Sequence, residues 1–224
     1  DQKCKIFVAD PYRDSDFITE SPIHLFKTWC KIYGLHYNNE QPQIYLTKPE
    51  LDYFSPFYKT DKPILAIQPH GGPEGLGYQY SWTRDVPSPI VNEVLEYYKE
   101  SHTIIHIKRQ DQIIYPDTLQ ALDGFRSIAI LLQLSDKRLL IDSFAQHMAA
   151  ALNLKSTVCW VSTKPEVFGY KLHNNVKAEP FTKEPDLTAA AYNPFHLTQD
   201  IHSIPYNDLN EVFTTDKIFI SLNS

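Results

Sequence analysis

Cysteine and long apolar segments are scarce in this sequence. Its three cysteines, Cys4, Cys30 and Cys159, are far apart and form no C-x-x-C pair, which excludes a disulfide framework and is typical of a reducing compartment. No apolar stretch approaches the ~20 residues that cross a bilayer, and no charged-then-apolar leader opens the chain. We therefore expect a soluble, cytoplasmic protein without a membrane span.

Basic charge is sparse as well. Over 224 residues, 21 lysines and arginines stand against 27 acidic residues, a net charge of −6, and no run of five like charges occurs. A nucleic-acid-binding surface would need a basic patch or stripe, so we expect no nucleic-acid partner. The length suffices for one large domain, or for one domain with a smaller piece.

Several cofactor and catalytic motifs are missing. The loop QPHGGPEGLG has the glycines Gly71, Gly72, Gly75 and Gly77, but they do not give G-x-G-x-x-G and no predicted helix follows them directly, which disfavours a dinucleotide site. Neither G-x-x-x-x-G-K-[ST] nor G-x-S-x-G occurs. His102 and His106 are four apart within a predicted strand, without a third ligand, so we expect no metal site.

The chain does contain an alternation of short apolar strands and amphipathic helices. We predict strands over residues 63–68, 103–108, 118–122, 138–141 and 157–161, and helices over residues 89–99, 127–134 and 143–152. Alternation at these lengths predicts an α/β fold of parallel, right-handed units. Ligands of such sheets bind at the carboxyl ends of the strands.

The two ends of the chain follow less regular patterns. We predict a strand over residues 5–9, a helix over 24–35, a strand over 43–46 and a helix over 48–57, before the polar segment Tyr58 to Pro63. From Phe181 onward the sequence is irregular and rich in proline, and it ends in a helix over residues 215–222. The predicted units are therefore 1–60, 61–180 and 181–224.

The most informative stretch runs from Lys137 to Ser162 and reads as strand, turn, helix and strand. Ser143 followed three residues later by Gln146 is a capping-box pattern, so a helix should begin there with its free N–H groups at the turn. A helix N-terminus at the carboxyl end of a parallel strand attracts anions. A phosphate-bearing ligand is the first hypothesis, and an ordinary turn that binds nothing is the alternative.

Other residues near the strand ends have two interpretations each. Arg84 is able to pair with phosphate through two donors. Trp82 could stack on a base or sugar, although a buried anchor is the commoner role. Arg109 could face the ligand crevice or be a solvated charge. His147 could reach a diphosphate or pack inside.

At this point the residues resemble a known family. The stretch IDSFAQHMAAALNLKSTVCWVSTKPEVFGY is similar to D-[ST]-G-x-x-H-x-A-A-A-L-G-x-P-T-V-x-L-F-G-x-T-x-P-x-x-[WF]-G of the heptosyltransferase-like glycosyltransferases, glycosyltransferase family 9. The positions in common are Asp142, Ser143, His147, 149–152, Thr157, Val158, Pro165 and Gly169. The strand PILAIQPHGG followed by Trp82 is similar to a second element, and the resemblance covers about residues 20–178.

The resemblance implies a GT-B fold, of which this chain would hold the Rossmann-like, C-terminal donor-binding domain, with helices on both faces of its sheet, and a partial N-terminal α/β piece. It implies a nucleotide-diphosphate-sugar donor, no cofactor or metal, inversion at the sugar carbon, and a glycan or lipid-linked acceptor. The donor diphosphate would lie against the helix that begins at Ser143. The substrate-binding residues would be His70, Gly71, Gly72, Trp82, Arg84, Arg109, Asp142, Ser143, Phe144, Ala145, Gln146 and His147.

The sequence also departs from the family pattern. Phe144 stands where the family has glycine, and Tyr80 stands where it has a lysine. No position matches the family's catalytic base, because the family's first domain begins well before the piece seen here. A partner chain could supply that domain. A non-catalytic nucleotide-sugar-binding module is the alternative function, and an NAD-dependent oxidoreductase is disfavoured by the missing fingerprint.

Overall fold

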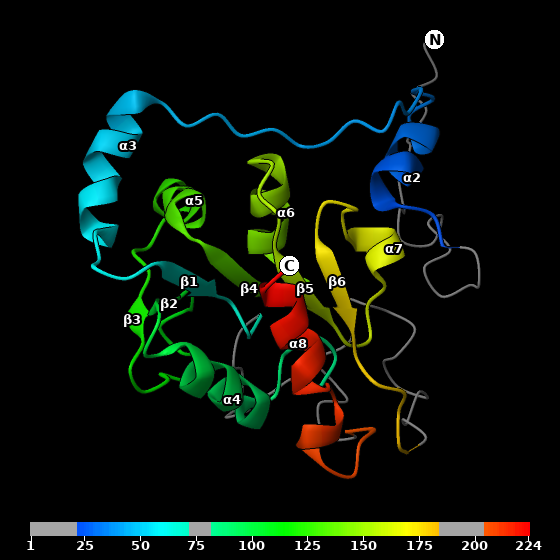
Figure 1. The fold of residues 1–224 in the computed structure, drawn as a ribbon. Coiled ribbons are helices and arrows are strands. Elements are labelled where there is room, and N and C mark those ends of the chain that lie inside the picture. The colour runs from blue at the N-terminus through cyan, green and yellow to red at the C-terminus, as the bar shows by residue number, and fades with distance from the viewer. Residues whose placement is uncertain (1–21, 72–81, 184–203) are drawn as a thin grey trace.

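The computed structural model describes residues 22–71, 82–183 and 204–224 (Figure 1). The strand predicted over residues 5–9 lies outside these ranges, and so do Gly72, Gly75, Gly77 and Tyr80. In the described part of residues 1–60 the regular elements are helices.

A six-stranded, wholly parallel sheet forms the centre of the molecule. Its strands are β1 (Ile64–Ile67), β2 (Thr103–His106), β3 (Leu119–Gln120), β4 (Lys137–Ile141), β5 (Thr157–Trp160) and β6 (Asn174–Lys177), in the spatial order β3-β2-β1-β4-β5-β6. Ile67 pairs with His106 on one side and with Leu139 on the other. From β1 the chain adds β2 and β3 on one side of the sheet, and it then adds β4, β5 and β6 on the other side. This change of side between β1 and β4 opens a crevice at their carboxyl ends.

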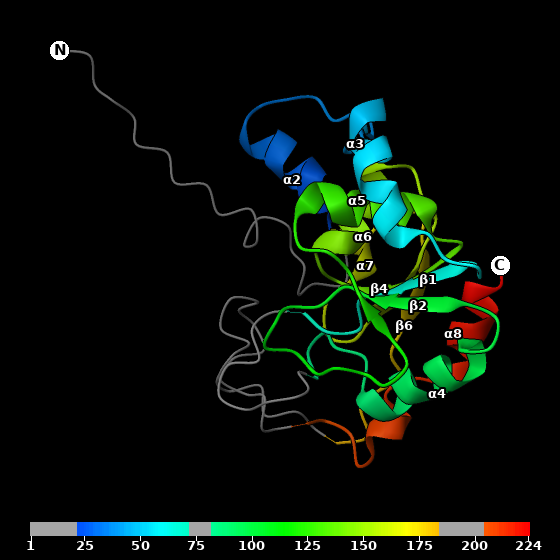
Figure 2. The same ribbon diagram turned by 90° about the vertical axis from the view of Figure 1, so that its left-hand side faces the viewer.

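Helices cover both faces of the sheet (Figures 1 and 2). On one face, α5 (Phe125–Leu134) and α6 (Phe144–Ala151) bury residues such as Leu131 and Ala149 against Leu140. On the other, α4 (Ser88–Tyr98) and α8 (Thr215–Leu222) form the second core together with Val212 and Phe213, which follow η3 (Leu209–Glu211). Both faces of each central strand are thus apolar, which is why these strands read as continuous hydrophobic runs.

The first described elements form an outer layer over α5 and α6 (Figure 2). They are α2 (Leu25–Ile32), α3 (Lys48–Phe54) and η1 (Ser55–Tyr58). Residues 35–47, which we call the strap, run between α2 and α3. Gly34, at φ +66, ends the α2 turn in a conformation that suits glycine.

The strand predicted over residues 43–46 is wrong. Exposed and less exposed residues alternate over residues 41–47 of the strap as they would in a strand. However, its neighbour is the end of a helix rather than another strand, since Ile44 N donates to Ala151 O at 2.9 Å. The pattern of residue types correctly indicates an extended chain, but not the partner that would make it a strand.

Other predictions are confirmed, with small shifts of the boundaries. The helix predicted from Ser127 begins at Phe125, and Asn153 adopts the left-handed conformation (φ +57) that ends α6. The sequence analysis missed α7 (Pro165–Phe168) and β6. β6 is an edge strand with two asparagines, so it lacks the apolar signal of a central strand. Within the described ranges, no helix has the length and apolar character needed to cross a membrane.

Candidate functional site

The loops that follow β1 and β4 meet at the crevice between these strands. The β1 loop is bonded back to the sheet, since Gln68 N donates to Leu139 O at 2.8 Å. The Gln68 side chain then crosses to the other loop, where its Nε2 donates to Ser143 Oγ at 3.2 Å. The residues after two strands that are distant in sequence therefore form one continuous edge.

Ser143 begins α6 as predicted, but the predicted capping box is not formed. The Ser143 side chain makes no capping bond with the helix, and its oxygen accepts from Gln68 instead. The Gln146 side chain donates to Phe168 O at 3.1 Å rather than folding back on Ser143. No side chain caps the start of α6, so an anion is one partner that its first amides could take.

Several buried polar atoms of the described residues have no hydrogen-bond partner, and some of them belong to residues near the carboxyl ends of the strands. Among the described residues they include Gln68 Oε1, His70 Nδ1, both ring nitrogens of His106, and Gln146 Oε1. Gln68 and His70 follow β1, His106 ends β2, and Gln146 lies in the first turn of α6. Because buried polar groups in folded proteins are almost always satisfied, an atom such as Gln68 Oε1, on the side chain that bonds Ser143, marks a place where water or a ligand belongs.

A buried chain of polar groups holds the β1 loop in place. His70 Nε2 lies 2.7 Å from the hydroxyl of Tyr115, which donates onward to Ser88 Oγ at 3.1 Å. His70 Nδ1 lies 3.4 Å from Asp85 Oδ2, and Gly71 N donates to Asp85 Oδ1 at 2.9 Å. Since His70 is only 1% exposed, we interpret it as a positioning group for the loop.

The structure places Arg84 at the crevice beside Gly71 and Asp142. A Cβ atom added to Gly71 would lie 2.9 Å from Arg84 Cδ, so the arginine stem fills the space that a side chain would need. Burial raises the pKa of Asp142, and the nearby Arg84 guanidinium acts against that shift. Next to the start of α6, the structure therefore has one acidic side chain, Asp142, and one positive charge, on Arg84.

Arg109 lies differently. Its Nε is 3.1 Å from Asp111 Oδ1 in its own loop, and its side chain is 59% exposed. The structure thus brings one of the two predicted arginines to the crevice, while the other pairs with a neighbour in solvent.

The remaining predicted residues divide between the edge and the interior. Trp82 is 3% exposed and contacts the Phe181 ring, in agreement with the anchor interpretation. The Phe144 ring turns to Phe125 of α5, with 5.7 Å between ring centres, while Ala145 is fully buried.

His147 packs toward α7 rather than toward the turn. Its Nδ1 lies 2.9 Å from the hydroxyl of Tyr170. Burial lowers its pKa to about 4, helped by the proximity of His24. His147 is therefore uncharged near neutral pH and gives no positive charge to a ligand there.

Gln68, Asp85 and Tyr115 were missed by the sequence analysis. The signal for Gln68 was available, because a polar residue directly after a buried parallel strand lies at the ligand edge. Asp85 and Tyr115 reach the edge only through tertiary contacts with His70 and Gly71. Over the described ranges, no group of three or more histidine, cysteine or acidic side chains is placed to hold a metal.

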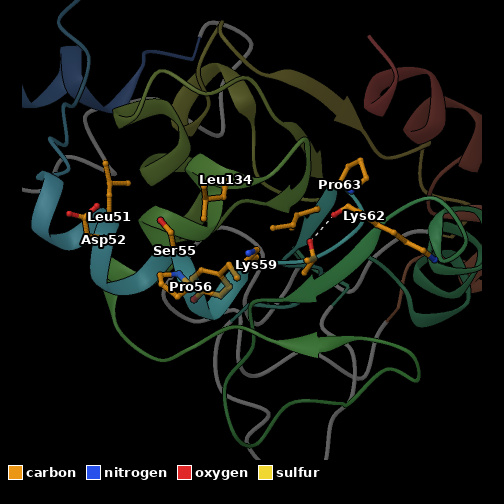
Figure 3. Close-up of a pocket in the computed structure, with 11 residues that line it drawn as sticks. Leu51, Asp52, Ser55, Pro56, Lys59, Lys62, Pro63 and Leu134 are labelled. Carbon is orange, nitrogen blue, oxygen red and sulfur yellow. Dashed lines mark hydrogen bonds between the residues drawn. The ribbon is translucent and has the colours of Figure 1, made fainter.

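A groove of about 740 Å³ lies at the opposite end of the strands (Figure 3). It runs between α3–η1 and the residues that lead into β1, with Leu134 at the end of α5 on its far side. Its lining includes Pro63 and Ile64, at the amino end of β1. The groove is thus on the edge of a parallel sheet where ligands do not usually bind.

The chain is similar to known proteins in structure but not in sequence. No protein-family model and no curated protein sequence matches the chain. Among solved structures, a glycosyl transferase family 9 protein from Veillonella parvula DSM 2008 matches with a TM-score of 0.58 and 10% identity, over 92% of this chain and 60% of that protein. E. coli heptosyltransferase WaaC with ADP matches with a TM-score of 0.49 and 13% identity, over 89% and 55%. E. coli ADP-heptose lps heptosyltransferase II gives 0.44 and 13%, over 77% and 55%.

The chain therefore has a Rossmann-like α/β fold of the glycosyltransferase type, as the resemblance predicted. The described strand order also agrees with a sheet whose ligand edge lies between β1 and β4. The chain spans about 60% of the length of the Veillonella protein.

Proposed function

We propose that this chain is the donor-binding portion of a glycosyltransferase and that it binds a nucleotide-diphosphate sugar at the carboxyl edge of β1 and β4. The observation that carries the proposal is the start of α6, which no side chain caps, together with the unpartnered Gln68 Oε1 on the side chain that bonds Ser143. The likeness in fold to a family 9 glycosyltransferase supports the same edge.

In this proposal the diphosphate lies over the first turn of α6. The amides of that turn and the Ser143 hydroxyl donate to its oxygens, and the helix dipole favours its negative charge. Arg84 supplies the cation that the missing lysine at position 80 would otherwise give. Arg109, which pairs with an exposed aspartate, is free to rotate toward the nucleotide at little cost.

The reaction we propose is a direct displacement with inversion and without a metal. An acceptor hydroxyl oxygen forms a bond to the anomeric carbon as the bond from that carbon to the diphosphate breaks. The electron pair leaves with the diphosphate, where the α6 amides and Arg84 stabilise the developing charge. The hydroxyl proton passes to a base that we do not assign to any residue of this chain.

The alternative is a non-catalytic nucleotide-sugar-binding module. It is favoured by the lack of an assigned base. Both alternatives place the nucleotide at the same edge, and they differ only in turnover.

A calorimetric screen tests the shared claim. The full chain is titrated with ADP, UDP, GDP and dTDP, with nucleotide sugars, and with NAD as a comparison ligand. We expect at least one nucleoside diphosphate to bind with a 1:1 stoichiometry and to raise the melting temperature, with a stabilisation that grows as the logarithm of its excess over Kd. If none of these nucleotides binds, both alternatives are wrong.

Two variants locate the binding edge. Arg84→Gln removes the cation next to Asp142 and should weaken diphosphate binding about tenfold, the usual effect of losing one charge-assisted contact. Lys48→Gln removes one positive charge from an exposed pair with Asp52 on α3, and it is the matched control. Equal affinity of the two variants would place the nucleotide elsewhere.

A further inference from the structure

A large, partly open cavity among the described residues lies away from the proposed donor edge. It is a cavity of about 970 Å³ between α2 and the strap on one side and the ends of α6, α7 and β6 on the other. Figure 1 shows α2 beside α7 with the strap passing above α6. Its volume is within the range of small-molecule sites.

The walls of this cavity are fixed at two points. His24 Nε2, at the start of α2, lies 2.9 Å from Gly169 O at the end of α7. The strap is held to the end of α6 by the bond from Ile44 N to Ala151 O. A Cβ atom on Gly169 would meet Pro165 O at 2.8 Å and Trp160 Cζ2 at 2.9 Å, so the tight end of α7 against β5 needs glycine there. The cavity is therefore preformed rather than induced.

Its charged lining has the opposite sign from the chain as a whole. Lys27, Lys171 and Lys177 line it, with Glu166 as the acidic partner of Lys177. Within the ranges that the structure describes, no carboxylate pairs with Lys27 or Lys171. Three lysines against one glutamate give a local charge of +2 in a chain of net charge −6. An anion is the ligand that this imbalance favours.

The uncharged lining suits a ligand with several hydroxyl groups. The carboxamides of Asn39, Gln41 and Asn153 line the cavity, and each both donates and accepts hydrogen bonds. The half-buried ring of Tyr37 gives an apolar surface beside them. The carbonyl of Ala151, which would repel an anion, is already taken by the strap.

We propose that this cavity binds a phosphorylated sugar, with the phosphate between Lys27 and Lys171 and the sugar hydroxyls on the strap carboxamides. This site is separate from the donor edge and does not rest on the proposed function. If both proposals hold, the chain binds a nucleotide sugar at the donor edge and a sugar phosphate in this cavity.

The test is calorimetric titration of the full chain with glucose 1-phosphate, glucose 6-phosphate, glucose and inorganic phosphate. We expect a sugar phosphate to bind more tightly than either glucose or inorganic phosphate. The double variant Lys27→Gln/Lys171→Gln should bind it at least tenfold more weakly, since two charged donors are lost. The double variant Lys48→Gln/Lys99→Gln removes two paired, exposed lysines elsewhere and should bind it as the wild type does.

Four results would overturn the proposal. They are no binding of either sugar phosphate, equal binding of inorganic phosphate alone, an unchanged affinity in Lys27→Gln/Lys171→Gln, and displacement of the sugar phosphate by a nucleoside diphosphate. The last result would mean that the sugar phosphate occupies the donor edge. The variant Arg84→Gln separates the two sites, because it should keep sugar phosphate binding while it weakens nucleotide binding.

Discussion

Gly71 and Arg84 share one small space at the carboxyl edge of the sheet. The arginine stem lies where a Gly71 side chain would be, and Ile141 Cδ1 closes the same space at 3.2 Å from the added Cβ. Arg84 can take this position because Gly71 has no Cβ atom.

The variant Gly71→Ala should therefore displace Arg84. We expect about tenfold weaker binding of nucleoside diphosphate, together with the ~1–3 kcal/mol loss of stability that overpacking brings. Calorimetry and urea unfolding measure the two effects. Arg84→Gln is the comparison, because it removes the charge without the crowding. Wild-type affinity in Gly71→Ala would show that Arg84 does not contact the ligand.

His106 is a second residue whose burial has a measurable consequence. It is 0% exposed, neither ring nitrogen has a hydrogen-bond partner, and burial, with the proximity of His70 and Lys108, lowers its pKa to about 3. Its ordinary pKa is 6.5, so the unfolded chain takes up a proton between pH 6.5 and 3 that the folded chain refuses. Falling pH in this window therefore lowers the free energy of unfolding, by at most ~1.4 kcal/mol per pH unit.

The variant His106→Leu should reduce that slope. Urea unfolding at several values between pH 5 and 6.5 measures it in a range where most carboxylates stay ionised. The wild type should lose stability as the pH falls, and the variant should lose less. His147, with a pKa of about 4, contributes in the same direction and remains in both proteins. An identical slope in both proteins would contradict the assignment of His106 as a buried neutral group.

Among the elements, the loop between α5 and β4 depends on one side chain. Arg138 is 8% exposed, and its guanidinium donates to the carbonyl oxygens of Leu132, Ser135 and Lys155. These three carbonyls belong to the end of α5, the turn into β4 and the segment before β5. The arginine thus joins three connections at the amino edge of the sheet.

Arg138→Met keeps most of the volume and loses all three bonds. We expect the free energy of unfolding to fall by ~2–4 kcal/mol, because buried carbonyls are left without partners. Arg109→Met removes an exposed arginine that pairs with Asp111 and should change stability by less than ~0.5 kcal/mol. Equal unfolding midpoints for the two variants would show that the Arg138 bonds are not structural.

Elements with a strong local signal could be predicted from the sequence, and those defined by a partner could not. β1, β4, β5 and α6 were predicted because their apolar residues follow the period of their structure. One strand was predicted in the strap but does not form, and one strand, β6, forms but was not predicted. Both errors have the same cause, which is that the partner of a strand is not visible in the local sequence. Only tertiary contact decides that Ile44 meets a helix end while Asn175 meets β5.

The candidate site was predictable to a similar extent. Asp142 and Ser143 follow from the strand-to-helix turn, which the pattern around them indicates. The partner of Ser143 did not follow, because the Gln68 bond joins residues 75 positions apart. The local capping-box pattern was overruled by that longer contact.

At the scale of the whole molecule, this chain can be tested for glycosyl transfer on its own. It spans 60% of the Veillonella protein, and we assign no base to it. We therefore expect the chain to bind a nucleotide-sugar donor with little or no glycosyl transfer. Chromatography of the donor after long incubation with simple acceptors and with water measures this. Efficient transfer by the chain alone would mean that a base has been overlooked among its own residues.

The central claim is that a nucleoside diphosphate lies over the first turn of α6, at the crevice between β1 and β4. Amide chemical shifts in a nitrogen-15-labelled chain test it most directly, during titration with the nucleoside diphosphate that binds most tightly. We predict that the largest changes occur at the amides of Phe144 and Ala145, where the phosphate oxygens would accept hydrogen bonds, and at the neighbouring amides of Gly71 and Gln146. Unchanged shifts at these amides in the saturated protein would contradict the account.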